Sequence, residues 1–69
     1  MVDINLLKYE LLKQNMNIST LAEKIGMSQT SMYNRIRAKG ETFTVKEVRS
    51  IQKALNLDNE ICINIFFTE

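Results

Sequence analysis

The hydrophobic residues of this chain recur at three- and four-residue steps along almost its whole length, which is the spacing of one helix face. The first segment begins after Asp3, a residue type that caps helices well, and its pattern breaks at Asn15. We therefore predict a first helix between them. Its core-facing stripe is predicted to contain Ile4, Leu7, Leu11 and Leu12.

Two shorter helical segments follow and meet at a glycine. Asn17 is placed to cap the second helix, which we expect to end at Gly26 because glycine tolerates the left-handed conformation of a tight exit. Ser28 is placed to cap a third helix, which we expect to run to about Lys39 and to end at Gly40. The predicted buried residues of the second helix are Leu21, Ala22 and Ile25.

The segment FTVKEV carries the clearest local signal in the chain. Thr44 as N-cap and Glu47 three residues later form the pattern of a capping box, and Phe43 and Val48 form a hydrophobic staple around it. Asn56 is placed to close this fourth helix. Its apolar stripe is Val48, Ile51 and Leu55.

The last segment, NEICINIFF, fits two structures. Ile61, Ile63 and Ile65 alternate as in a strand, whereas Ile61, Ile65 and Phe66 fit a helical turn. With Asp58 as a possible cap, we favour a short helix followed by an extended tail.

These elements predict an all-α fold, a compact bundle of five short helices in one domain spanning residues 1–69. The composition, 45% hydrophobic and 25% charged, is typical of a soluble globular protein. A chain of this length buries only about 60% of its extended surface, so its core is thin. The single cysteine, Cys62, forms no disulfide framework and suits a reducing compartment. The start of the chain has no signal-peptide pattern and its longest apolar run is far shorter than a membrane helix, so we expect a cytoplasmic protein without membrane contact.

Catalysis receives little support from the sequence. The chain has no histidine, no glycine-rich phosphate loop and no cluster of residues at metal-ligand spacing. Cys62 has no histidine to activate it, and a buried apolar thiol is the simpler interpretation. We therefore expect no enzymatic activity, no cofactor, no metal and no small-molecule substrate.

The net charge of +1 is unevenly distributed. Residues 24–53 carry seven basic side chains against two acidic ones, a net of +5, whereas residues 1–23 have a net charge of −1 and residues 54–69 a net charge of −3. A basic centre between acidic ends indicates a local site for a polyanion. On charge alone, an ordinary solvated surface fits equally well.

Only the residues GMS separate the hydrophobic stretches of the second and third helices, which is the spacing of a helix-turn-helix. Ala22 supports this prediction, because two helices that cross steeply need a small side chain where they approach. The segment LAEKIGMSQTSMYNRI, with Ala22, Gly26 and Met32, resembles the helix-turn-helix of the phage lambda repressor and Cro superfamily. The resemblance extends over residues 3–57 and is strongest to small Cro-like regulators of Gram-positive phages. Arg35 departs from it, standing where many relatives carry an aliphatic residue.

The resemblance implies a lambda repressor-like domain with its helix-turn-helix at about residues 18–38. It also implies a sequence-specific DNA-binding transcriptional regulator, a phage or prophage repressor of Cro type, which places the third helix in the major groove. The expected partners are a palindromic double-stranded DNA operator and a second copy of the chain, as a homodimer on DNA.

The third helix has an inward face with Met32 and Ile36 and an outward polar face. Gln29 can pair with adenine, and Arg37 can pair with guanine or with phosphate. Tyr33 either joins them or packs over the helix stem. The predicted base-contacting residues are Ser28, Gln29, Thr30, Tyr33, Asn34 and Arg37.

Phosphates are expected at two helix starts, where free amides and the helix dipole attract anions. The resemblance implies that Asn17 grips the DNA backbone at one start. We expect Lys39 and the Thr44 end of the fourth helix to hold the opposite flank. The predicted phosphate-contacting residues are Asn17, Ser19, Lys39, Thr44 and Lys46.

The apolar tail carries more hydrophobic residues than a thin core requires. They either cover the base of the bundle or form a two-fold dimer seam, for which the candidate residues are Ile63, Phe66 and Phe67. A seam would set two recognition helices about 34 Å apart, one turn of DNA. The alternative function is a protein-interaction module of antirepressor type, which binds another regulator through the same fold.

Overall fold

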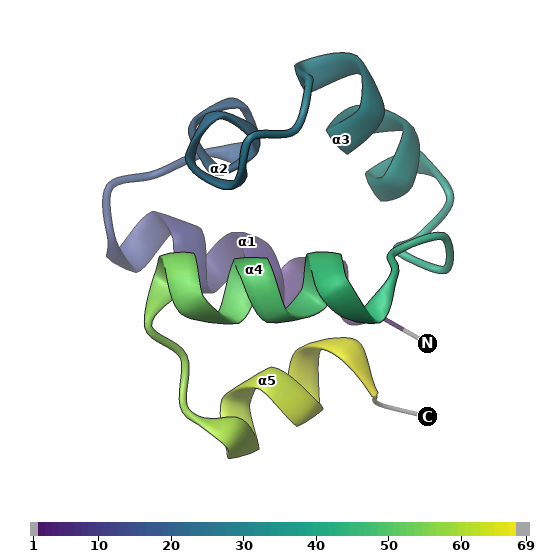
Figure 1. Ribbon diagram of the computed structural model, residues 1–69. Helices are drawn as coiled ribbons and strands as arrows, with labels where there is room; N and C mark the ends of the chain where they lie inside the picture. The colour runs from purple at the N-terminus through teal and green to yellow at the C-terminus, as the bar shows by residue number, and fades with distance from the viewer. Residues whose placement is uncertain (1, 68–69) are drawn as a thin grey trace.

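The structure is a computed structural model that describes residues 2–67. Over these residues the chain forms five helices and no strand, which confirms the predicted all-α bundle (Figure 1). The ambiguous last segment is helical, and the extended tail predicted after it lies, apart from Phe67, outside the described residues. The helices are α1 (Ile4–Lys13), α2 (Ile18–Ile25), α3 (Gln29–Arg37), α4 (Val45–Leu55) and α5 (Asn59–Phe66).

Each helix begins where a side-chain oxygen accepts a hydrogen bond from a backbone amide of the first turn. At α4 both halves of the predicted capping box are present: Thr44 Oγ1 accepts from the Glu47 amide at 3.1 Å, and Glu47 Oε1 accepts from the Thr44 amide at 2.9 Å. All five predicted caps are confirmed, namely Asp3, Asn17, Ser28, Thr44 and Asp58.

Left-handed residues separate the helices. Gly26 (φ 74°) ends α2 and Asn56 (φ 52°) ends α4, both as predicted. The third helix is shorter than predicted and ends at Arg37. Lys39 (φ 59°) and Gly40 (φ 77°) are both left-handed, and a right-handed helix does not continue through such residues.

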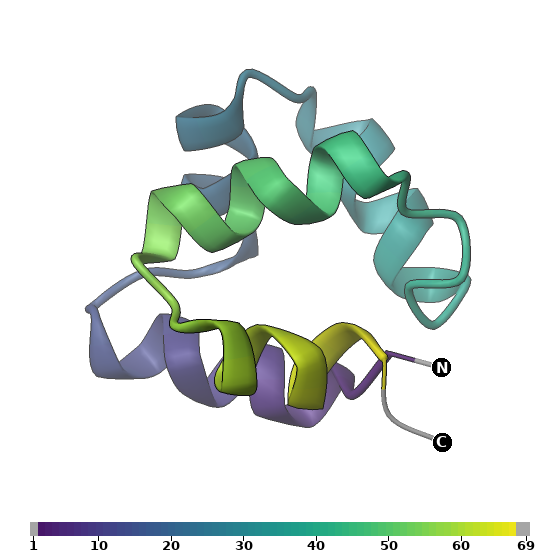
Figure 2. The ribbon, with the colours of Figure 1, turned by 60° about the horizontal axis from the view of Figure 1, so that its bottom comes forward.

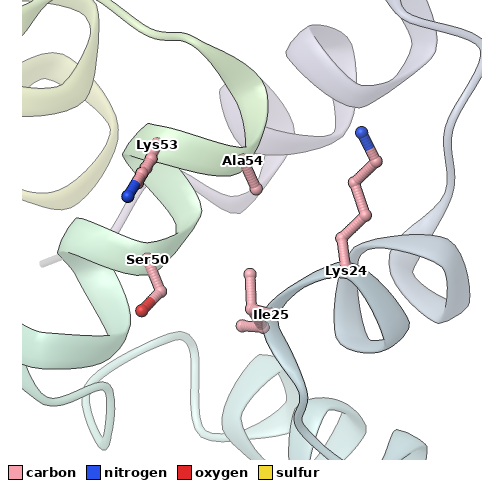
Figure 3. A pocket seen from close by; sticks show the side chains of 5 residues that line it. All are labelled: Lys24, Ile25, Ser50, Lys53 and Ala54. Atoms are coloured by element: carbon pink, nitrogen blue, oxygen red, sulfur yellow. The ribbon is translucent and has the colours of Figure 1, made fainter.

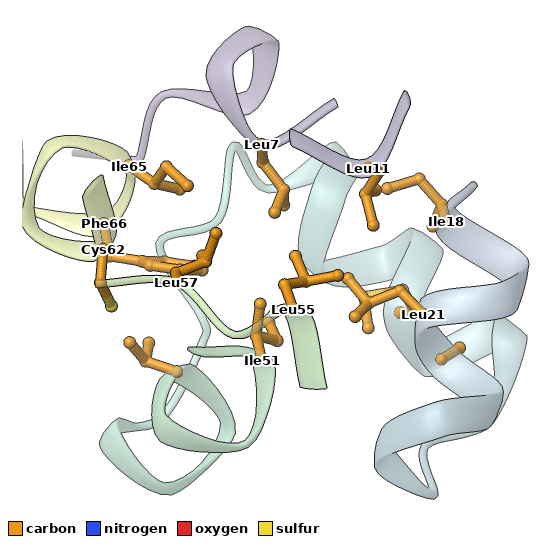
Figure 4. Packing of buried hydrophobic residues seen from close by; sticks show 13 residues of the cluster. Leu7, Leu11, Ile18, Leu21, Ile51, Leu55, Leu57, Cys62, Ile65 and Phe66 are labelled. Carbon is orange, nitrogen blue, oxygen red and sulfur yellow. The ribbon is translucent and has the colours of Figure 1, made fainter. Parts of the chain in front are cut away.

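The hydrophobic core lies at the centre of the bundle and draws on all five helices (Figure 4). Ile51 and Leu55 of α4 are almost completely buried, between residues of α1 and α2 on one side and of α5 on the other. The large side chains with the least exposure are Leu7, Leu11, Leu21, Met32, Ile51, Leu55 and Ile65.

The predicted stripe of α1 is wrong at one residue. Leu12 is 71% exposed, whereas Leu7 and Leu11 are buried. The other helices cover the side of α1 that carries Leu7 and Leu11, and Leu12, about 100° further round the helix than Leu11, lies outside the covered arc. The buried side of α1 instead includes Glu10, which is 5% exposed and forms an ion pair with Lys13 at 3.1 Å.

Helix α5 runs alongside α1 and closes the base of the bundle (Figure 2). The Asp3 amide donates a hydrogen bond to the Ile65 carbonyl at 2.6 Å, which joins the start of α1 to the end of α5. Phe66 is 5% exposed and packs edge-on against Phe43, with ring centroids 5.9 Å apart. Cys62 is buried and its thiol is free, and desolvation raises the pKa of that thiol. Among the described residues, no helix combines the length and the apolar character that crossing a membrane requires.

Candidate nucleic-acid interface

Helices α2 and α3 are joined by three residues, Gly26 to Ser28, and run in clearly different directions (Figure 1). The turn is closed by a hydrogen bond from the Met27 amide to the Ala22 carbonyl at 2.9 Å. Ala22 itself has no exposed surface, as expected of a small side chain where two helices meet. This short connection fixes α3 at the edge of the bundle, with one side against the core and the other facing outward.

Helix α3 separates its apolar and polar side chains as the sequence predicts. Met32 is completely buried and Ile36 packs against the core from a half-buried position. The opposite face is polar and reaches solvent. All the predicted base-contacting residues are exposed, namely Ser28, Gln29, Thr30, Tyr33, Asn34 and Arg37.

A paired arginine and glutamate anchor α3 to α4, which sequence reasoning missed. Arg35 Nε and Nη2 donate to Glu47 Oε1 and Oε2, each at 2.9 Å. The hydrogen bond from Arg35 holds the pKa of Glu47 below its usual range. Because Glu47 also caps α4, one carboxylate fixes both the end of α3 and the start of α4. In the sequence Arg35 stands out only as a departure from the helix-turn-helix that the chain resembles, and an arginine beside the inward face of a helix is the signal for an acidic partner.

Three of the predicted site residues meet in a polar cluster between α2 and α3. The hydroxyls of Ser19 and Tyr33 lie 3.2 Å apart in hydrogen-bond contact, and Ser19 Oγ also donates to Gln29 Oε1 at 3.4 Å. Ser19 was predicted to contact phosphate, and Gln29 and Tyr33 to contact bases. The cluster joins these two groups of residues and orients the first turn of α3 relative to α2.

The remaining phosphate candidates lie at helix starts and in the α3–α4 turn. Asn17 Oδ1 accepts from the Thr20 amide at 2.9 Å and from the Thr20 hydroxyl at 3.0 Å, so this oxygen serves the cap of α2. The Thr44 hydroxyl serves the cap of α4 in the same way. Lys39, in the turn, and Lys46, in the first turn of α4, are exposed. These residues thus present two capped helix N-termini and two lysine side chains to solvent.

The predicted dimer seam requires one correction. Phe66 belongs to the core of the single chain, so its ring is not available to a partner. Ile63 and Phe67 are 54% and 60% exposed, and they leave an apolar surface at the end of α5.

A hollow of about 570 Å³ lies between α2 and α4, away from the outward face of α3, and is lined by Lys24, Ile25, Ser50, Lys53 and Ala54 (Figure 3). The amines of Lys24 and Lys53 point in different directions and do not converge on a common point. Two diverging lysines do not form a site for one anion, so this hollow is a poor candidate for the functional site.

No known protein family, curated protein or solved structure matches this chain. The function is therefore inferred from the residues and their geometry.

Proposed function

We propose that the protein is a sequence-specific DNA-binding transcriptional regulator, a repressor of Cro type that places α3 in the major groove of its operator. The observation that carries this proposal is the two-sided construction of α3. Thr30, Asn34 and Arg37 are exposed on one side, and the other side is held by the core and by the Arg35–Glu47 pair. The major groove admits one helix, and amide, hydroxyl and guanidinium groups are the ones that distinguish base pairs there.

The DNA backbone would be held on both flanks of α3. The N-termini of α2 and α4 supply amides and positive dipole ends, and Lys39 and Lys46 supply charge beside the second of them. Such contacts position the protein on the duplex, whereas α3 specifies the sequence. Arg35 contributes little to this field because Glu47 neutralises it.

A homodimer on a palindromic operator fits the exposed apolar end of α5. Ile63 and Phe67 are the seam residues that remain after Phe66 is assigned to the core. A two-fold seam there sets the two recognition helices about 34 Å apart, so each reads one half-site.

Selection of bound sequences from random duplexes tests the proposal directly. We expect enrichment of a palindrome whose half-sites are separated by about one helical turn. A selection at low salt that enriches no sequence would contradict the proposed function.

Substitutions at Arg37 and Gln29 test the assigned roles. We expect Arg37→Ala and Gln29→Ala each to weaken binding to the selected duplex by about 1–3 kcal/mol while leaving the fold intact, because both side chains are exposed. The control Lys53→Ala, on the far hollow, should leave specific binding unchanged. Equal losses on selected and random duplexes would show that these two residues contact the backbone and not the bases.

The salt dependence of binding tests the dimer. Two subunits with Arg37, Lys39 and Lys46 neutralise on the order of four to six phosphates, which gives a log–log salt slope of about −4 to −5. Replacing Ile63 and Phe67 together with serine should roughly halve that slope, because single subunits then occupy half-sites. Both side chains are largely exposed, so circular dichroism should remain native. A folded variant that keeps the full slope would remove α5 from the dimer seam.

A further inference from the structure

An apolar groove lies beside the proposed DNA-binding face, between α1, the start of α2 and α3. It encloses about 570 Å³, and its lining includes Lys8, Leu11, Leu12, Asn17, Tyr33 and Ile36. We call this surface the α1–α3 groove. Its lining is mostly apolar, with a few polar groups at the edges, which is the composition of binding clefts in general.

The apolar surface continues out of the groove along α1. Leu12, which lines the groove, is 71% exposed, and Tyr9, one turn earlier on the same helix, is 56% exposed. One exposed leucine on a protein surface needs no explanation. Leu12 in the groove and Tyr9 one turn before it are two large exposed side chains on α1, and the Lys13 amine lies over the Tyr9 ring, 5.1 Å from its centroid. Exposed apolar side chains that gather beside a groove mark interaction sites.

Among the described residues that line the groove, the one charged side chain is basic. Lys8 lines the groove, Arg37 lies one turn beyond Tyr33 on α3, and the positive end of the α2 dipole lies at Asn17. None of the described residues that line the groove is acidic. The nearby carboxylate of Glu10 is buried and paired with Lys13. A complementary occupant is therefore apolar along its centre and negatively charged along its edges.

We propose that the α1–α3 groove binds an acidic amphipathic helix of another protein. Such a helix presents apolar side chains at positions i, i+3 or i+4 and i+7, which is the recurring way in which helices occupy apolar grooves. Its apolar residues pack against Leu12 and Ile36, and its carboxylates lie near Lys8 and the start of α2. The groove is open to solvent and does not enclose a ligand, so a helix fits it better than a small molecule, which needs a pocket that encloses most of its surface.

Binding in this groove excludes DNA. Asn17 and Tyr33 line the groove and also belong to the predicted DNA-contacting residues, so one occupant covers the contacts of the other. This consequence rests on the proposed function, and by linkage each ligand weakens the binding of the other by the same factor. The groove thus supplies a means of releasing the protein from its operator.

The binding experiment uses the full chain and two synthetic peptides. The first has leucines at helical spacing and glutamates at the remaining positions, and the second has lysines in place of the glutamates. Nuclear magnetic resonance spectra of the ¹⁵N-labelled protein should shift at α1, at the start of α2 and at Tyr33 with the acidic peptide only. Leu12→Glu and Lys8→Glu should each weaken binding on the order of tenfold, because they place negative charge against the acidic peptide.

Matched controls carry the same substitutions elsewhere. Val45→Glu changes an exposed apolar residue of α4, and Lys53→Glu changes a lysine of the far hollow, so both should leave peptide binding unchanged. Circular dichroism checks the fold of each variant, and Leu12→Ser replaces Leu12→Glu if the latter unfolds. Three results would overturn the proposal: shifts confined to α5, equal binding of the basic peptide, or loss of binding in Val45→Glu and not in Leu12→Glu.

Two further measurements separate this proposal from its alternatives. Anilinonaphthalene sulfonate, a small apolar anion, should have no higher affinity for the groove than the acidic peptide has. If the dye bound tightly and the peptide did not bind, the groove would be a small-molecule site. The acidic peptide should also displace the selected duplex. Peptide binding is measured without DNA, so a failed duplex selection would contradict the proposed function and leave the groove's occupant established. A ternary complex with peptide and duplex would refute the overlap.

Discussion

Replacing Gly40 with alanine tests the turn between α3 and α4, and Gly26→Ala is its matched control. Both glycines are left-handed, with φ +77° and +74°, so an L-residue at either position costs about 1–2 kcal/mol. A Cβ at Gly40 would lie 2.5, 2.6 and 2.8 Å from three side-chain carbons of Val2, whereas a Cβ at Gly26 meets nothing within 4 Å. Overpacking of this kind adds about 1–3 kcal/mol, and only Gly40→Ala incurs it.

The difference is large for a domain of this size, whose total stability is on the order of 0.05–0.15 kcal/mol per residue. Since 1 kcal/mol shifts the Tm of a small domain by about 4–8 °C, we expect Gly26→Ala to lower the Tm by roughly 5–10 °C and Gly40→Ala by roughly 10–25 °C. Thermal unfolding followed by circular dichroism, with urea unfolding as a second measure, gives both values.

A third substitution isolates the contact. Val2→Gly removes all three carbons that the new Cβ would meet, so in that background Gly40→Ala should cost no more than Gly26→Ala does. The double-mutant cycle gives the interaction directly. If both substitutions lowered the free energy of unfolding equally, Val2 would move aside without cost. The packing of the N-terminal segment against this turn would then not contribute to stability.

Three further predictions concern single side chains. Leu11→Ala should destabilise the fold by about 2–5 kcal/mol and Leu12→Ala by less than about 0.5 kcal/mol, and similar losses by urea unfolding would contradict their assigned burial. Arg35 lowers the pKa of Glu47. The ion pair therefore stabilises the fold fully at pH values above the usual carboxyl pKa of about 4.5, and this stabilisation is lost as the pH falls through the lowered pKa of Glu47. Glu47→Gln should therefore lower the Tm at neutral pH. The difference in Tm between the variant and the unmodified protein should become smaller as the pH falls toward about 2. A difference in Tm that stays constant with pH would exclude the ion pair as its cause. Burial raises the pKa of the Cys62 thiol, so alkylation at about pH 8 should be much slower than for a free thiol and should reach the free-thiol rate in urea; fast alkylation of the folded protein would refute its burial.

Features set by near neighbours in sequence could be predicted from the sequence. The Thr44–Glu47 capping box and the left-handed exit at Gly26 each involve a few consecutive residues, and both are present in the structure. A cap depends on an oxygen and an amide three residues apart, so its residue types alone indicate it. For the same reason the outward face of α3 followed from helical periodicity around Met32 and Ile36.

Features that depend on contacts between distant segments could not be predicted in the same way. Periodicity admitted Leu12 to the stripe of α1, and only the packing of the other helices decides which side of α1 is covered. The Arg35–Glu47 pair spans a turn whose course the sequence leaves open. The sequence fits Phe66 equally well to the core and to the dimer seam, and its contact with Phe43, which is distant in sequence, decides for the core. The DNA contacts themselves stay a prediction, because they concern a partner and not the chain alone.

The residues that anchor α3 and those that it exposes are different ones, except for Gln29 and Tyr33, which are exposed and also contact Ser19 of α2. Met32, Arg35 and Ile36 hold the helix, whereas Thr30, Asn34 and Arg37 make none of the contacts that hold it to the bundle. Mutational drift at these outer positions therefore leaves the fold intact, so an evolving lineage can change what the helix presents one substitution at a time. For the same reason a combinatorial library randomised at these three positions should consist almost entirely of folded members.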